Sequence, residues 1–262
     1  MDEASSGEAP SGQGTSPDEL PFVAPCRDID PRAPLRWLRL GWRDLRAAPA
    51  ISLAYGAFIL LLSALVSWIA WRWGSGWMLL VLLSGFIFVA PVLAIGLYAV
   101  SERIASGRPV SLAHCLFEER RHIPDLLVYS LILLVICLVW VRAGSGVQIF
   151  YPDSGQPSFE ELATFFTIGS AVGSIFACVA FAASAFSLPM LLDRRTDAVT
   201  AVVTSINAVL RNKKAMLVWI VLIVAAVALG FATGLLGLAV TMPLIGHATW
   251  HAYNQIYPTA SK

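Results

Sequence analysis

Five long stretches of the chain contain no charged residue, and they constrain the fold more than any other feature. They are Ile51–Trp71, Trp77–Val100, Leu126–Val141, Leu162–Leu192 and Ala215–Ile245. An α-helix needs about 20 apolar residues to cross the roughly 30 Å hydrocarbon layer of a membrane. Charged residues make up only 13% of the 262 residues, about half the share of roughly 25% in a soluble protein. The sequence therefore predicts an all-α, polytopic helical membrane protein.

The number of spans depends on the last stretch. Ala215–Ile245 could form one long tilted helix, or two shorter helices that turn near Gly230–Gly234. We predict two, which gives six transmembrane helices, at about residues 51–71, 77–100, 126–141, 167–192, 215–229 and 233–250. The third of these is short for a span unless its helix continues past Arg142. Five spans are the alternative.

A weak internal repeat favours six spans over five. Three units each begin with an amphipathic interfacial segment, at residues 35–45, 112–120 and 201–210, which a transmembrane hairpin follows. The second helix of each hairpin carries a proline in a similar position, namely Pro91, Pro189 and Pro243. Repeats of this kind indicate an architecture built from one recurring unit.

The start of the chain differs from everything after it. Residues 1–34 are rich in Ser, Gly, Pro, Asp and Glu and lack apolar periodicity, which predicts a disordered tail. Residues 35–256 would form the integral membrane domain, and residues 257–262 a short tail. Six arginines precede the first span. Because cytoplasmic segments collect Lys and Arg, we expect the N-terminus in the cytoplasm.

Residues 35–45 have the pattern of a helix lying in the plane of the membrane surface. Leu35, Leu38, Trp42 and Leu45 recur at helical spacing, and a basic face follows one residue later: Arg36, Arg39, Arg43 and Arg46. We expect these arginines and Trp42 to lie at the lipid interface. In the third unit, the predicted apolar face is Val199, Val202, Val203, Ile206, Val209 and Leu210. Its opposite side holds Thr200, Thr204, Asn207 and Arg211.

Small residues recur every four positions in two of the predicted spans. They are Gly169, Gly173 and Ala177 in the fourth span, and Gly230 and Gly234 near the last turn. Such stripes let helices approach closely in lipid, where packing drives association. We predict packing within the chain, with an oligomer interface as the alternative.

Few residues could carry chemistry. His247 and His251 lie four residues apart, so one helix face would present both rings to a metal or haem. No third ligand completes the set, and we predict neither a metal nor a cofactor, with these two histidines as weak candidates. We find no catalytic or phosphate-binding motif. The formal net charge of +1 gives no bulk basic excess for nucleic acid.

Several segments resemble one known family. They are Trp37–Leu45 with Pro49, Ala90-Pro91, Leu188–Arg194, and the ending Pro243–Tyr253, which reads PLIGHATWHAY. Together they resemble the bacterial integral membrane proteins grouped as domain-of-unknown-function family 2189, over roughly residues 35–256. The resemblance implies a multi-pass protein of the bacterial inner membrane and implies no mechanism.

These observations favour a non-enzymatic role, as a scaffold, accessory subunit or assembly factor of a membrane complex. Its partners would be the lipid bilayer and, as an open alternative, other membrane proteins. A transporter or channel for a small neutral or amphipathic solute is the second class, because internal repeats with interrupted helices are common in transporters. A metal- or haem-binding respiratory component is the third, and it depends on His247 and His251.

Overall fold

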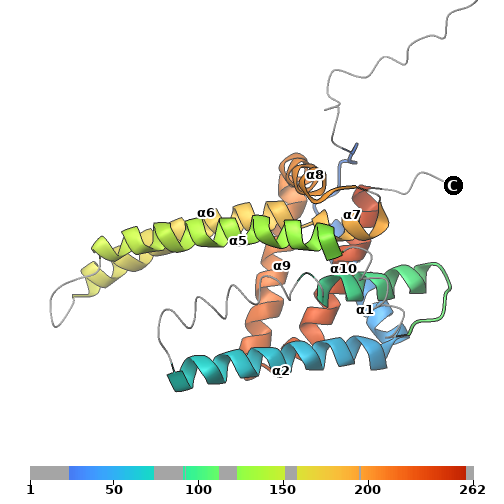
Figure 1. The fold of residues 1–262 in the computed structure, drawn as a ribbon, viewed down its shortest axis with the longest axis horizontal. Helices are drawn as coiled ribbons and strands as arrows, with labels where there is room; N and C mark the ends of the chain where they lie inside the picture. The colour runs from blue at the N-terminus through green and yellow to red at the C-terminus, as the bar shows by residue number, and fades with distance from the viewer. Residues whose placement is uncertain are drawn as a thin grey trace, which may run out of the picture.

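The computed structural model describes residues 24–73, 91, 93–111, 123–150, 158–194 and 196–257, and all the regular structure within them is helical (Figure 1). Residues 93–105 form one helical segment. A short 3-10 turn, Gln148–Phe150, follows α5. The labelled helices are α1 (Ala33–Ala47), α2 (Pro49–Trp73), α5 (Ile123–Val147), α6 (Phe159–Ser184), α7 (Ser187–Asp193), α8 (Ala198–Arg211), α9 (Lys213–Ala232) and α10 (Leu238–Ile256).

Four segments of the described chain are long and apolar enough to cross a membrane. They are Pro49–Ile69, Ile123–Val147, Phe159–Asp193 and Lys213–Ala232. Most of the predicted second span lies outside the described residues, and α10 is not among the four. The structure therefore confirms a multi-pass helical protein, while the count of six and the repeat stay predictions.

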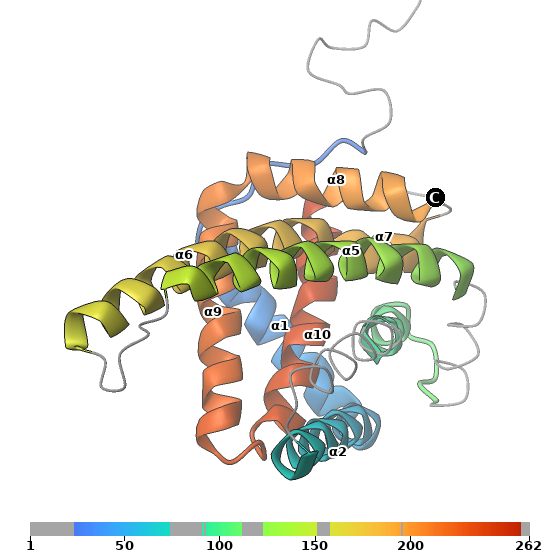
Figure 2. The same cartoon turned by 60° about the vertical axis from the view of Figure 1, so that its left-hand side comes forward.

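The long helices run in two main directions. In Figure 1, α2 and the α5–α6 hairpin lie roughly horizontally, and both α2 and α5 begin at the right. In both views α9 and α10 stand upright and cross the α5–α6 hairpin (Figure 2). The shared direction of α2 and α5 matches a chain that enters both spans from one side. The crosswise α9–α10 hairpin leaves the six-span arrangement unconfirmed.

Two helices extend beyond the spans predicted for them. The third predicted span, 126–141, is the longer helix α5, which continues past Arg142 and resolves the short length noted above. The fourth starts at Phe159, eight residues before the predicted position, because Ser158 and Glu161 form a capping box. The Ser158 hydroxyl accepts from the Glu161 amide, and the Glu161 carboxylate accepts from the Ser158 amide at 2.8 Å. Such a box gives hydrogen-bond partners to backbone N–H groups that would otherwise be unpaired at the start of a helix.

The fourth predicted span also breaks at residues 185–186, between α6 and α7. Pro189 is the cause, because a proline has no N–H to donate and its ring displaces the carbonyl four residues earlier. Ser205 of α8 bridges the break. Its hydroxyl accepts from the Phe186 amide at 3.0 Å and donates to the Ala182 carbonyl at 2.7 Å. Pro243, by contrast, lies inside α10, so the two prolines act differently.

The predicted turn near Gly230–Gly234 is present. Gly234 has φ +64° and Leu235 has φ +74°. Both values lie in the left-handed region, which glycine adopts readily and a residue with a side chain adopts only with strain. The Leu235 amide donates to the Gly230 carbonyl at 3.1 Å, which closes the turn. The chain therefore reverses between α9 and α10, as the two-helix interpretation requires.

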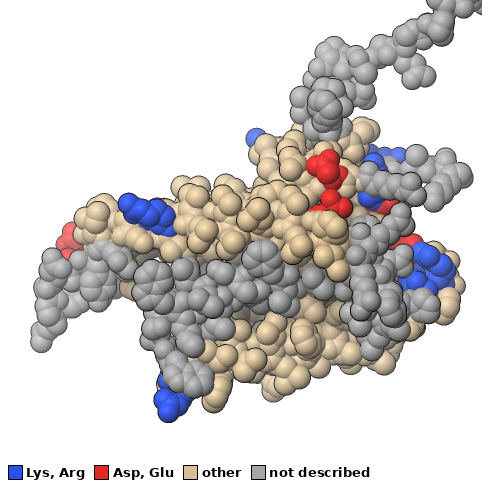
Figure 3. Space-filling model, viewed as in Figure 1, with Lys and Arg blue, Asp and Glu red and all other residues tan. Residues whose placement is uncertain are grey.

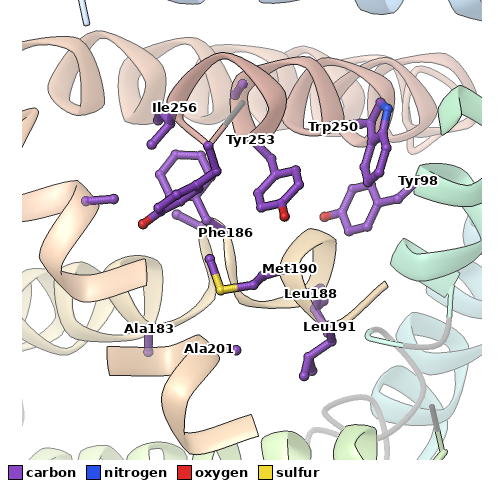
Figure 4. Packing of buried hydrophobic residues seen from close by; sticks show 14 of the residues in the cluster. Tyr98, Ala183, Phe186, Leu188, Met190, Leu191, Ala201, Trp250, Tyr253 and Ile256 are labelled. Atoms are coloured by element: carbon purple, nitrogen blue, oxygen red, sulfur yellow. The ribbon is translucent and has the colours of Figure 1, made fainter. Parts of the chain in front are cut away.

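The best-packed core lies where helix ends meet. Figure 4 shows Trp250, Tyr253 and Ile256 of α10 facing Phe186 and Met190 of the α6–α7 break, with Tyr98 beside Trp250. Tyr129 near the start of α5 and Trp37 of α1 belong to the same buried cluster. Most of each long apolar helix is outside it, since only 17–44% of the four candidate spans is buried. The fold is thus a compact base from which apolar helices extend.

The two amphipathic helices pack differently from the prediction. In α8 half of the predicted apolar face is exposed, at Val199, Val203 and Leu210, while Val202 is buried together with small or polar residues such as Thr204 and Ser205. In α1, Leu35 and Trp42 of the predicted face are exposed, while Trp37 is the buried anchor. Small residues therefore lie at the contacts between helices, and larger apolar residues are left exposed to lipid. This is the packing preference of membrane proteins.

Charged residues are distributed unevenly over the surface. On the face shown in Figure 3, uncharged surface extends along the long helices, and Lys, Arg, Asp and Glu gather near their ends. Part of this face is covered by residues that are not described. An uncharged belt between charged ends is the surface that a bilayer requires.

Candidate functional site

Helix α10 gathers the buried polar side chains of the base, and His247 lies at their centre. This side chain is fully buried, and both ring nitrogens face hydroxyls. Nε2 lies 2.9 Å from the Ser52 hydroxyl of α2, and Nδ1 lies 2.7 Å from the Ser101 hydroxyl of residues 93–105. One nitrogen of a neutral imidazole donates and the other accepts. His247 therefore joins three helices through two hydrogen bonds and needs no charge to do so.

One turn further along α10, His251 contacts a buried carboxylate. Its Nε2 lies 2.7 Å from Oδ2 of Asp44 in α1, and the Asp44 side chain is 1% exposed. The second oxygen of Asp44 has no hydrogen-bond partner within the described residues, and Arg43 Nε is 3.9 Å away. A buried carboxylate is costly without a partner. The contact with His251 thus fixes α1 against α10.

Close helix crossings make these contacts possible. A Cβ at Gly41 of α1 would lie 2.7 Å from the Ala248 amide nitrogen of α10, and a Cβ at Gly56 of α2 would overlap the Ala239 carbonyl oxygen. Only glycine allows backbones to approach this closely. Neither position was predicted, although Ala48, Ser52 and Gly56 recur every four residues and are a signal for the second crossing.

A second polar group lies at the end of α10. The Tyr253 hydroxyl donates to Asp193 Oδ2 at 2.7 Å and accepts from Arg194 Nε at 3.1 Å. Burial raises the pKa of the Tyr253 hydroxyl, and the bond to Asp193 raises it further. Tyr253 therefore stays protonated and donates to Asp193 at the end of α7. Burial likewise raises the pKa of Tyr257, whose hydroxyl donates to the Thr204 carbonyl of α8 at 2.9 Å.

Two further contacts extend the network to the N-terminal segment. Trp37 Nε1 donates to Gln255 Oε1 at 2.6 Å, and its ring meets Trp219 of α9 edge-on at 5.6 Å between centroids. The Arg27 amide donates to the Ile256 carbonyl at 3.1 Å. Through these bonds α10 contacts nearly every element of the base.

The two histidine candidates do not form a shared ligand set. Each ring has its own hydrogen-bond partners in a different helix, and the described residues contain no group of three side chains that could hold a metal. His247 is fully buried, and 13% of the His251 side chain is exposed. Within the described residues, both histidines make contacts between helices.

The predicted packing stripes occupy two different settings. Gly173 and Ala177 line an apolar groove of about 340 Å³ between α5 and α6, together with Leu133, Ile136 and Trp140. A Cβ added at Gly169 would lie 3.7 Å from Val147 Cγ1, which is an ordinary van der Waals distance. Gly230 packs against Leu238, and Gly234 forms the turn. Their role in packing stays a prediction.

The predicted lipid-interface residues share the outer side of α1. Arg36, Arg39, Arg43 and Arg46 are all exposed, and the Arg46 guanidinium lies over the Trp42 ring at 5.1 Å. Trp42 and Leu35 are exposed beside them. The buried side of α1, which faces α10, is opposite. This arrangement fits an in-plane helix between the protein and lipid headgroups.

The comparison with protein families agrees with the resemblance. Residues 78–193 match the family described as "Predicted integral membrane protein (DUF2189)". Over this range the chain is therefore similar to a family of integral membrane proteins whose function is unknown, as the resemblance predicts. The matched range ends before α8, so the Pro243–Tyr253 stretch lies outside it. No curated protein and no solved structure matches the chain.

Proposed function

We propose that the chain is a non-enzymatic protein of the bacterial inner membrane that acts as a scaffold, accessory subunit or assembly factor. One observation supports this most strongly. Within the described residues, the polar side chains of the base that could perform chemistry are occupied by contacts between helices; they are Asp44, His247, His251 and Tyr253. Through these contacts α10 is the central helix of the base. A packed base with exposed apolar helices suits a protein that holds other membrane components in place.

The surroundings of the prolines support a scaffold over a transporter. A transporter would need a polar cavity near Pro91, Pro189 and Pro243 in the predicted even-numbered spans. All three prolines are buried, and Pro189 lies among Leu188, Met190 and Leu191 of the apolar cluster. Transport of a small neutral or amphipathic solute remains the alternative. Uptake of such a solute into liposomes containing the purified chain would favour it.

We further propose that both chain ends are cytoplasmic, with α9 and α10 as the last two of six spans. The distribution of charge supports this. In that topology Arg72 and Arg142 are the only arginines or lysines outside the cytoplasm, out of 18 such residues. Both lie near the ends of helices, α2 and α5, that begin on the same side of the molecule. The positive-inside preference therefore agrees with the shared direction of these helices.

The scaffold proposal is tested by purification of the full-length chain, tagged and expressed at its native level, in a mild detergent. We expect a membrane partner that remains at fixed stoichiometry through size-exclusion chromatography and cross-links to named residues of this chain. Gly173→Leu changes the surface of the α5–α6 groove, and Gly144→Leu on α5 is the matched control, because a Cβ at either position meets only open space. A homogeneous, unaccompanied monomer would count against the proposal.

A further inference from the structure

A basic cavity lies at the junction of α8 and α9. It has a volume of about 520 Å³, and its walls are Asp28, Ile29 and Pro31 of the N-terminal segment and residues 210–215. In Figure 2 the N-terminal segment passes along α8 toward the start of α9. The wall therefore joins two parts of the chain that are far apart in sequence.

Three cations surround this cavity. Arg211, Lys213 and Lys214 line it and are exposed. The acidic residue of the lining, Asp28, is 4.0 Å from Arg211 Nε, and its side chain is 83% exposed. Within the described part of the chain, the two lysines form no ion pair. The cavity therefore has a positive excess that its own residues leave uncompensated.

The cavity walls are held in place by Asn212, whose side chain is buried. Its Oδ1 accepts from the Ile29 amide at 2.7 Å. Its Nδ2 donates to the Arg27 carbonyl at 3.2 Å and to the Ala208 carbonyl at 3.1 Å. One side chain thus ties the N-terminal segment to α8. These bonds hold the two backbone walls of the cavity together beside the three cations.

The position of the cavity at the start of a candidate membrane span indicates which anion it binds. Lys213 is the first residue of α9, the most apolar of the four candidate spans. Val199, Val203 and Leu210 of the adjacent α8 present exposed apolar side chains. Cations at the boundary of a transmembrane helix lie at the depth of lipid phosphates, and basic pockets beside such helices bind acidic headgroups.

We propose that this cavity, with Arg211, Lys213 and Lys214 as its ligating cations, binds the phosphate of an anionic phospholipid headgroup. The headgroup occupies the cavity between residues 28–31 and 210–215, and its acyl chains lie along the exposed apolar face of α8. The lining cations belong to α8 and α9, and the proposal does not depend on the scaffold role. It fixes the N-terminal segment, and through it α1, at the membrane surface.

The proposal is tested with the full-length protein in an uncharged detergent. Its thermal unfolding midpoint is measured with added phosphatidylglycerol, with phosphatidylcholine, and with inorganic phosphate at the same concentration. We expect phosphatidylglycerol to raise the midpoint and the other two to change it little. Native mass spectrometry of the same samples should show retained phosphatidylglycerol molecules.

The double variant Lys213→Gln/Lys214→Gln should lose at least half of the phosphatidylglycerol response, and Lys213→Arg/Lys214→Arg should keep it. Arg142→Gln is the control, because it removes an exposed cation at the far end of α5. An undiminished response in the double variant, an equal loss in Arg142→Gln, or equal stabilisation by inorganic phosphate would each overturn the proposal.

Discussion

At the scale of single residues, the stability of the base depends on where the buried polar groups find partners. Asp44 has 1% of its side chain exposed, and His251 is its close partner. His247 is shared by two serines from different helices. Each contact joins residues more than 140 positions apart in sequence. The network is therefore part of what brings the helices of the base together.

The Asp44–His251 contact makes a prediction about stability. His251→Leu leaves the buried carboxylate without its partner, which should destabilise the protein by about 3–5 kcal/mol. Asp44→Asn removes the charge and should cost less. In the double variant Asp44→Asn/His251→Leu the losses should be less than additive. Unfolding in detergent, followed by circular dichroism, measures all three, and strictly additive losses would show that the two side chains do not interact.

At the scale of elements, small residues determine which helices touch. Gly41 and Gly56 allow α1 and α2 to cross α10 closely, whereas Gly144 and Gly173 face open space. A glycine stripe therefore does not reveal which glycine is in a contact. The apolar runs, the all-helical class and the turn after α9 follow from the sequence, because span length and turn glycines are local signals. The faces of α1 and α8 do not, because periodicity marks an apolar face without saying whether protein or lipid covers it.

The central contacts of the candidate site show the same limit. The spacing of His247 and His251 singled out two residues on one helix, yet Ser52, Ser101 and Asp44 carry no motif that links them to α10. Their pairing depends on crossings that only the tertiary structure defines. The early start of α6 was predictable, since Ser158 and Glu161 have the spacing of a capping box.

The two groups of glycines predict opposite effects of one substitution. Gly56→Ala should destabilise the fold strongly, because the added Cβ overlaps the Ala239 carbonyl oxygen. The backbone of α10 would have to move to relieve this clash. Gly144→Ala should be neutral or stabilising by up to about 1 kcal/mol, since alanine is the better helix former. Thermal unfolding of both variants in the same detergent makes the comparison. Equal effects would show that α2 does not cross α10 closely.

The start of α8 makes a prediction that depends on pH. Asp197 accepts from the amides of Val199 and Thr200, both at 3.0 Å. The Thr200 bonds are the main cause that holds the pKa of Asp197 below its usual value. Asp197→Ala should cost about 1 kcal/mol near neutral pH, as removal of a helix cap does. Because the folded pKa is lowered, this stability is present above the unfolded pKa of about 3.9 and is lost as pH falls through the folded value.

Asp197→Asn provides the matched control for this cap. An amide oxygen also accepts from the first amides of a helix, so the variant should keep most of the stability and lose its dependence on acidity. Chemical unfolding of the wild type and both variants between pH 3 and 7 measures the difference. If the difference in unfolding free energy between the wild type and Asp197→Ala increased toward low pH, the result would be inconsistent with the cap.

At the scale of the whole molecule, the structure divides into a compact base and the apolar helices that extend from it. The starts of α2 and α5 and the ends of α7 and α10 contribute to the base. In the proposed topology all of these ends are cytoplasmic, so the base would lie at the inner face of the membrane. Flipping the arginine-rich start of the chain outward would cost about 2.3 kcal/mol per charge per 100 mV.

The most direct test of this account is a pair of reporter fusions to the full chain in a bacterial cell. Alkaline phosphatase, which is active only outside the cytoplasm, is placed at Ser154 between α5 and α6, and green fluorescent protein is placed after Lys262. The account predicts phosphatase activity from the first fusion and fluorescence from the second. Phosphatase activity from a fusion after Lys262 would mean an odd number of spans, and would contradict both the six-span topology and the placement of the base at the cytoplasmic face.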